Sequence, residues 1–165
     1  MKAKPREKRP AFSVTHKDES MAELVRETDH KTLAVWALDC AERVLPGFEE
    51  KYPDDPRPRN AIDVLRTWIT TGAFRMADIR KAALFAHAAA RETGEDNAAR
   101  SAARAAGHAV ATAHVPSHSL GAALYARQAV WRAADLIEAD FAVAKERDWQ
   151  YRHLLALRDP SESQN

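Results

Sequence analysis

Apolar residues recur at the spacing of an α-helix over most of the chain. One such stripe covers 29–44, with Asp29 in the position of an N-cap. We predict three more helices: one at 55–71 with Asp55 as its cap and Pro56 in its first turn, one at about 75–93, and one at about 96–114. A last stripe begins at 117 and is too long for one ordinary helix, which predicts a break or kink near 133–140.

These patterns predict an all-α, single-domain bundle or array of about five to six helices. No alternation of the strand type, bounded by turn signals, occurs in the sequence. The helical domain is expected at 20–158, with one short helical turn near 21–26, a flexible basic leader at 1–19 and a polar tail at 159–165.

Alanine dominates the composition, with 34 alanines against 5 glycines in a chain that is 45% hydrophobic and 7% aromatic. Alanine favours helices and occupies little volume, so the composition predicts helices that pack closely together. It excludes a collagen-like chain, a disulfide scaffold and a mostly disordered chain.

The net charge of +1 conceals an uneven distribution. Residues 1–10 carry five basic residues and one acidic residue, whereas the rest of the chain carries 20 basic and 23 acidic residues. A mildly acidic body does not favour a nucleic-acid partner. No run of about 18 apolar residues is present, so no membrane span is expected. The single cysteine, Cys40, cannot form an internal disulfide and indicates a cytoplasmic protein.

The histidines are the first candidates for chemistry. His114 and His118 are four residues apart, a spacing that places two imidazoles on one helix face, where both can bind one divalent metal such as zinc. His87 or His108 could then supply a third ligand. Pro116 lies between the pair, however, and the alternative is that His114 ends one helix and His118 begins the next. On that reading no cofactor is expected.

Carboxylates and guanidinium groups form a second set of candidates. Asp39 and Glu42 share one helix edge, and Arg57 and Arg59 begin the next long helix. The four can form an inter-helix salt-bridge network, which we favour, or a clamp for a ligand.

A polar ridge marks the third long helix, because Arg80, His87 and Arg91 follow one another at spacings of seven and four. Such ridges are usually solvated. If this one faces inward, it is the best candidate for a small-ligand site.

Cys40 and the four tryptophans are expected to have mainly structural roles. Cys40 lies in the middle of a predicted helix among apolar neighbours, which indicates a buried thiol and not a nucleophile. Trp36 and Trp68 fall on apolar stripes and are predicted in the core. Trp131 and Trp149 have charged neighbours and are predicted as partly exposed anchors for a partner.

Several segments resemble the immunity-protein-5-like family, which is assigned to bacterial polymorphic-toxin systems. The resemblance covers about residues 29–130 and is carried, in order, by DHKTLAVWALDCAERVLPGFE, DDPRPRNAIDVLRTW, ADIRKAALFAHAAARE and AARAAGHAVATAHVPSHSLGAALYA. The positions that match the family's motifs are Trp36, Asp39, Cys40, Glu42, Asp55, Arg57, Pro58, Arg59, Arg80, His87, Arg91, His108, His114, His118 and Tyr125.

The resemblance implies an all-helical, cytoplasmic, non-enzymatic protein that binds and neutralises a toxin. The absence of a Gly-rich phosphate loop and of GxSxG, HExxH and CxxC motifs also favours a protein that is not an enzyme. Our leading hypothesis is therefore a protein partner, with a basic toxin domain binding the acidic body. The alternative is a metal- or small-ligand-binding domain, or an enzyme, centred on the histidines, with Arg80 and Arg91 holding an anion.

Overall fold

The computed structural model describes residues 12–13 and 17–160. Every regular element in these ranges is a helix, and the elements are α1 (Glu19–Arg26), α2 (His30–Val44), α3 (Pro46–Glu49), α4 (Arg57–Thr71), α5 (Met76–Glu92), α6 (Ala98–Ala111), α7 (His118–Ala133) and α8 (Ala139–Arg158). The all-α prediction is confirmed for the described part of the chain. Nearly all of the predicted basic leader, and most of the polar tail, lie outside it.

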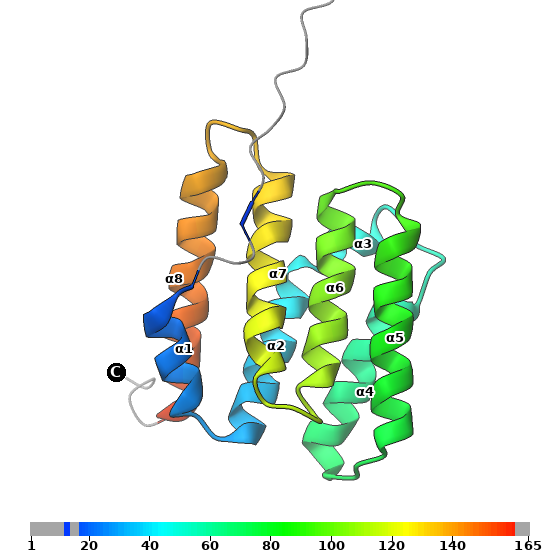
Figure 1. The fold of residues 1–165 in the computed structure, drawn as a ribbon, viewed down its shortest axis with the longest axis vertical. Coiled ribbons are helices and arrows are strands. Elements are labelled where there is room, and N and C mark those ends of the chain that lie inside the picture. The colour runs from blue at the N-terminus through cyan, green and yellow to red at the C-terminus, as the bar shows by residue number, and fades with distance from the viewer. Residues whose placement is uncertain (1–11, 14–16, 161–165) are drawn as a thin grey trace, which may run out of the picture.

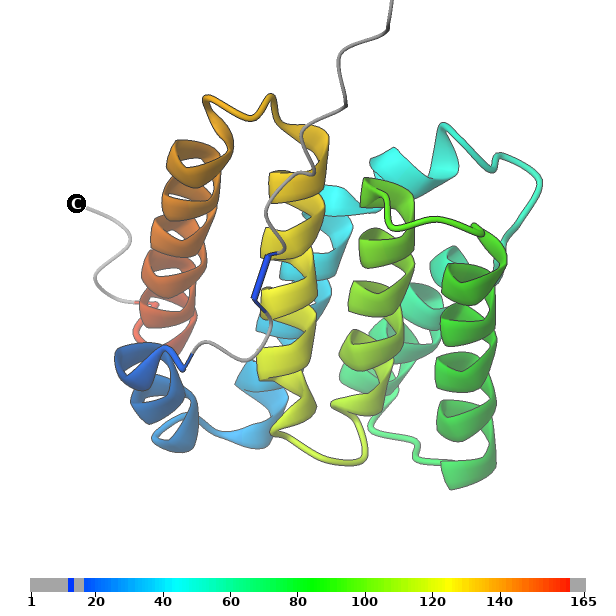
Figure 2. The same cartoon turned by 45° about the horizontal axis from the view of Figure 1, so that its top comes forward.

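The helices form two layers. Helices α8, α7, α6 and α5 lie side by side in one layer, and α2 and α4 lie behind them (Figure 1). Helix α1 lies across the lower end of α8, and α3 lies near the opposite end of the bundle (Figure 2). Consecutive long helices run in opposite directions, so segments that are distant in sequence become neighbours, such as α2 and α7.

Helix α6 lies at the centre of this arrangement and contacts α5, α7, α2 and α4. Nine of its 14 residues are buried, and six of these nine are alanines. Small side chains allow these four helices and the short α3 to approach one axis, which explains the alanine content of this segment. The larger core residues lie on the surrounding helices, for example Trp36 of α2, Phe48 of α3 and Ile62 of α4.

Local sequence signals account for several helix ends. The Asp29 carboxylate accepts a hydrogen bond from the Thr32 backbone N–H at 3.0 Å, as the sequence predicts. Gly72 ends α4 at a φ of 68°, a conformation that glycine adopts without strain. The predicted cap at Asp55 is wrong: Pro56 occupies the cap position, and the Asp55 carboxylate binds the backbone N–H and guanidinium group of Arg57.

The predicted helix number is too low, because the described residues contain seven helices of eight or more residues and the four-residue α3. The segment expected to form one turn is the complete helix α1. The Asp18 carboxylate caps α1 and also pairs with Arg147 of α8, a tertiary contact that no local pattern reveals. The predicted break near 133–140 is confirmed, since α7 ends at Ala133 and α8 begins at Ala139.

The tryptophans follow the predicted division in part. Trp36 is completely buried, and its Nε1 donates to the Gln150 carbonyl at 2.9 Å. Trp68 is only half-buried at the edge of the core. Trp131 and Trp149 are also half-buried, and the Trp149 ring packs against both the Arg43 guanidinium at 3.8 Å and the His153 ring at 4.7 Å. None of the helices in the described ranges is both long and apolar enough to cross a bilayer.

Candidate functional site

Three histidines from three adjacent helices meet in one cluster, which we call the histidine cluster: His87 of α5, His108 of α6 and His118 of α7, together with Tyr125 of α7. The His108 ring is at the centre. Its centroid lies 5.2 Å from that of His87, edge to face, and 5.6 Å from that of His118. The Tyr125 ring stacks on it at 5.1 Å with an interplanar angle of 17°.

Two glycines inside helices make room for these rings. A Cβ atom at Gly107 of α6 would lie 2.7 Å from His87 Nε2, and one at Gly121 of α7 would lie 2.5 Å from His108 Nδ1. Both distances are far shorter than a van der Waals contact. The two glycines therefore belong to the site, although the sequence analysis did not assign them to it. An isolated glycine within a helical pattern is the signal that could have found them.

The surroundings of the cluster keep two of its imidazoles neutral. Burial lowers the pKa of His108 to about 4, and the neighbouring His87, His118 and Arg104 contribute in the same direction. Burial, followed by Arg104 and Arg91, also lowers the pKa of His87. The Nδ1 atoms of His87 and His108 are buried without a hydrogen-bond partner. Because a buried N–H without an acceptor is costly, we assign the proton of each neutral ring to Nε2.

Arg104 of α6 lies one helical turn from His108 and is half-buried, yet its side chain forms no hydrogen bond or ion pair with any described residue. Arg104 is not among the site residues predicted from the sequence. Nothing in the local sequence distinguishes it from the other arginines of the chain.

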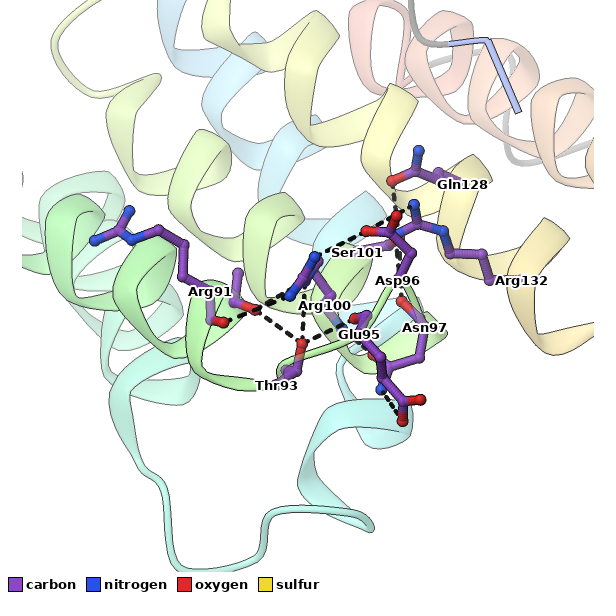
Figure 3. A network of polar contacts seen from close by, with 10 residues as sticks. Arg91, Thr93, Glu95, Asp96, Asn97, Arg100, Ser101, Gln128 and Arg132 are labelled. Atoms are coloured by element: carbon purple, nitrogen blue, oxygen red, sulfur yellow. Dashed lines mark hydrogen bonds and ion pairs between the residues drawn. The ribbon is translucent and has the colours of Figure 1, made fainter. Parts of the chain in front are cut away.

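The arginines at the other end of α6 are paired, as Figure 3 shows. There the Asp96 carboxylate contacts Arg100 at 2.8 Å and Arg132 at 3.6 Å, and Arg132 also donates to the Ser101 hydroxyl at 2.9 Å. That hydroxyl in turn donates to Gln128 at 2.9 Å. This network connects the α5–α6 loop to α7, and the guanidinium groups of Arg100 and Arg132 both contact the Asp96 carboxylate.

The predicted metal pair is divided between two environments. His114 follows the end of α6, is exposed, and stacks on Phe74 at 6.3 Å, whereas His118 is the first residue of α7 and packs on His108. The two residues do not share one continuous helix, because α6 ends at Ala111. Within the described ranges, no group of three or more His, Cys, Asp and Glu residues is arranged to hold a metal ion.

The second predicted set is engaged in ion pairs within the chain. Glu42 binds Arg59 at 2.8 Å and Arg66 at 2.7 Å. Arg59 also binds Glu49 at 2.6 Å, and Asp39 binds the His153 ring at 2.7 Å. Arg57 pairs with Asp55 at 2.7 Å and with Glu92. Of the four predicted residues, only Glu42 and Arg59 pair with each other, whereas Asp39 and Arg57 pair with residues outside the predicted set.

The three residues of the predicted polar ridge on α5 also lie in different environments. His87 turns toward α6, while Arg80 and Arg91 are exposed. Cys40 is completely buried, and burial raises the pKa of its thiol well above the ordinary value. The prediction of a buried core thiol is therefore confirmed.

Two exposed apolar surfaces lie away from the histidine cluster. The α7–α8 corner, which we define as residues 135–141, exposes 58% of Leu136, 98% of Ile137 and 75% of Phe141. A groove of about 910 Å³ lies between α4 and α5, and its lining includes Trp68, Phe74 and Phe85. Surfaces of this kind are typical of sites that bind other proteins.

The fold and these surfaces define a class of protein: an alanine-rich helical bundle with exposed apolar surfaces and a half-buried histidine cluster. A family model described as "Imm-5 like putative immunity protein" matches residues 23–157. The chain belongs to this family, as the sequence resemblance implied. No curated protein and no solved structure shows significant similarity to it.

Proposed function

We propose that the protein binds and neutralises a cognate bacterial toxin, and that the α7–α8 corner is the surface that contacts it. Membership of a family of immunity proteins supports a protein partner. The observation that carries the choice of surface is the exposure of Leu136, Ile137 and Phe141 within seven consecutive residues. A few side chains at the centre of an interface contribute most of the binding free energy, and aromatic side chains such as Phe are enriched there.

The charges around these residues favour a basic partner. Asp135, Glu138 and Asp140 are all exposed at the corner, and the sequence from 133 to 144 contains no lysine or arginine. An acidic edge around an apolar centre attracts a cationic surface and increases the association rate. The α4–α5 groove is less suited to such a partner, because its lining contains two cationic residues, Arg75 and Lys81, and one acidic residue, Asp78.

The proposal is tested by producing the protein together with the toxin encoded beside its gene and measuring cell survival and the Kd of the complex. Leu136→Lys places a cation at the centre of the corner. We expect it to weaken binding by about 2 kcal/mol or more, roughly 30-fold in Kd, and to abolish protection.

Leu84→Lys is the matched control, because Leu84 of α5 is exposed to the same 58% but lies outside the corner. It should leave the Kd and the protection unchanged. If Leu136→Lys binds as tightly as the wild type, the corner is not the interface. If the wild type binds no toxin, the proposed function is wrong.

A further inference from the structure

The two exposed apolar surfaces of the protein differ in charge, and the α7–α8 corner is the acidic one. Its large apolar side chains, Leu136, Ile137 and Phe141, are more than half exposed. It also carries three carboxylates, from Asp135, Glu138 and Asp140. None of these carboxylates forms an ion pair with a described residue, so the negative charge of the corner is not neutralised there.

The α4–α5 groove has a cationic excess. Its volume is about 910 Å³, and its lining includes aromatic rings such as Trp68 and Phe85. Arg75 and Lys81 also line it, are exposed, and form no ion pair with a described residue. The one acidic residue of the lining, Asp78, lies in the first turn of α5, where the helix dipole offsets a negative charge. An apolar segment that carries carboxylates therefore complements this groove.

The corner and the groove of one molecule lie far from each other. The corner connects α7 to α8 at one end of the bundle, whereas the α4–α5 connection lies at the opposite end and on the other side (Figures 1 and 2). The acidic corner cannot cover the groove of its own chain. The corner of another molecule can, because it is exposed at a turn between two helices.

We propose that the α4–α5 groove binds the α7–α8 corner of a second copy of this chain. The apolar side chains of the corner enter the groove, and its carboxylates face Arg75 and Lys81 at the rim. Because the contact joins two different surfaces, each copy can bind one neighbour at either surface, and the assembly grows head to tail into a ring or an open chain.

This inference does not rest on the proposed function, because both partners are copies of this chain. The corner is also the surface proposed for the toxin, so a second copy and a toxin compete for it. The test below uses no toxin, and its outcome is independent of toxin binding.

The test is light scattering of the purified, full-length protein over a range of concentrations up to about 1 mM, since a contact of one short segment with one groove is expected to have a Kd between micromolar and millimolar. The weight-average mass should rise with concentration and pass that of a dimer. Ile137→Lys damages only the corner, and Phe85→Glu damages only the groove. Each should raise the Kd of association about tenfold or more.

An equimolar mixture of these two variants distinguishes the head-to-tail contact from other modes of association. The Ile137→Lys protein keeps its groove and the Phe85→Glu protein keeps its corner, so the mixture should form a dimer with the wild-type Kd and nothing larger. Leu84→Glu is the matched control, because Leu84 is exposed on the same helix as Phe85 but does not line the groove. It should associate as the wild type does.

Folding is not expected to limit the test. Ile137 is 98% exposed, and the exposed Lys81 provides a second groove variant, Lys81→Glu, if Phe85→Glu does not fold. The proposal is overturned if the wild type stays monomeric at every concentration, which leaves the groove to a partner of another kind. It is also overturned if the mixture associates no better than the separate variants, since each surface would then pair with itself or take no part.

Discussion

Substitution of Gly121 by alanine tests the close packing on which the histidine cluster depends. The new Cβ atom would lie 2.5 Å from His108 Nδ1 and 2.8 Å from His108 Cγ. The Cγ atom is next to the root of the side chain, so a rotation of the ring does not remove the clash. The ring also packs on His87, His118 and Tyr125, which limits its movement.

The expected free energies follow from two opposed effects. Overpacking of a close contact costs about 1–3 kcal/mol. Alanine in place of glycine inside a helix contributes about 1 kcal/mol in the opposite direction. Gly121→Ala should therefore lower the free energy of unfolding by about 0–2 kcal/mol in the wild-type background. In a His108→Ala background the clash is absent, and the same substitution should stabilise the protein by about 1 kcal/mol.

The wild type, the two single variants and the double variant form a double-mutant cycle. Urea unfolding of these four proteins measures the coupling free energy between Gly121 and His108. The expected coupling free energy is about 1–3 kcal/mol. Gly47→Ala is the control, because nothing lies within 4 Å of a Cβ atom at Gly47 and its φ is not positive. It should be neutral or stabilising. A coupling near zero, with Gly121→Ala stabilising in both backgrounds, would refute the claim that His108 requires a glycine on α7.

Two further predictions concern charge. Arg43→Ala leaves the Glu146 carboxylate, whose side chain is only 9% exposed, without its bidentate partner, and it should lower the free energy of unfolding in urea by roughly 1–3 kcal/mol. Arg152→Ala breaks an exposed pair with Asp148 and should change this free energy by less than about 0.5 kcal/mol. Equal effects of the two substitutions would contradict the role of burial. The pKa of His108 is lowered from 6.5 to about 4 on folding, so its contribution to stability is complete above pH 6.5 and is lost as the pH falls toward 4. When the pH is lowered from 7 to 4, the free energy of unfolding of the wild type should therefore fall by roughly 3 kcal/mol more than that of His108→Gln. Parallel plots of unfolding free energy against pH for the two proteins would refute this.

The sequence predicted most of the long helices because their signals are local. The ranges expected at 55–71 and 75–93 differ from α4 and α5 by at most two residues at each end. Helical periodicity, glycine at the C-terminus and a break after α7 can all be recognised within a short window of sequence. The cap at Asp55 was wrong because an aspartate before a proline also fits a turn, and here its carboxylate binds the guanidinium group of Arg57.

The candidate site was predictable only as a set of residue types. Histidines at 87, 108 and 118 were selected from the sequence, and the structure brings these three together. His114 was selected with equal weight, but it lies in the exposed connection after α6 and packs on Phe74. The pairing of Asp39 with His153 joins residues that are 114 positions apart, so no spacing rule could have found it.

What the sequence determined by itself is the secondary structure and the kind of packing: periodic apolar positions produce helices, and an excess of alanine allows them to lie close together. Only the tertiary structure decided which polar groups are compensated. Arg100 and Arg104 are one turn apart on the same helix, yet Arg100 contacts the Asp96 carboxylate and no carboxylate of the described residues contacts Arg104. The difference arises because burial and charge neutralisation depend on neighbouring helices, and the sequence of a single helix does not specify them.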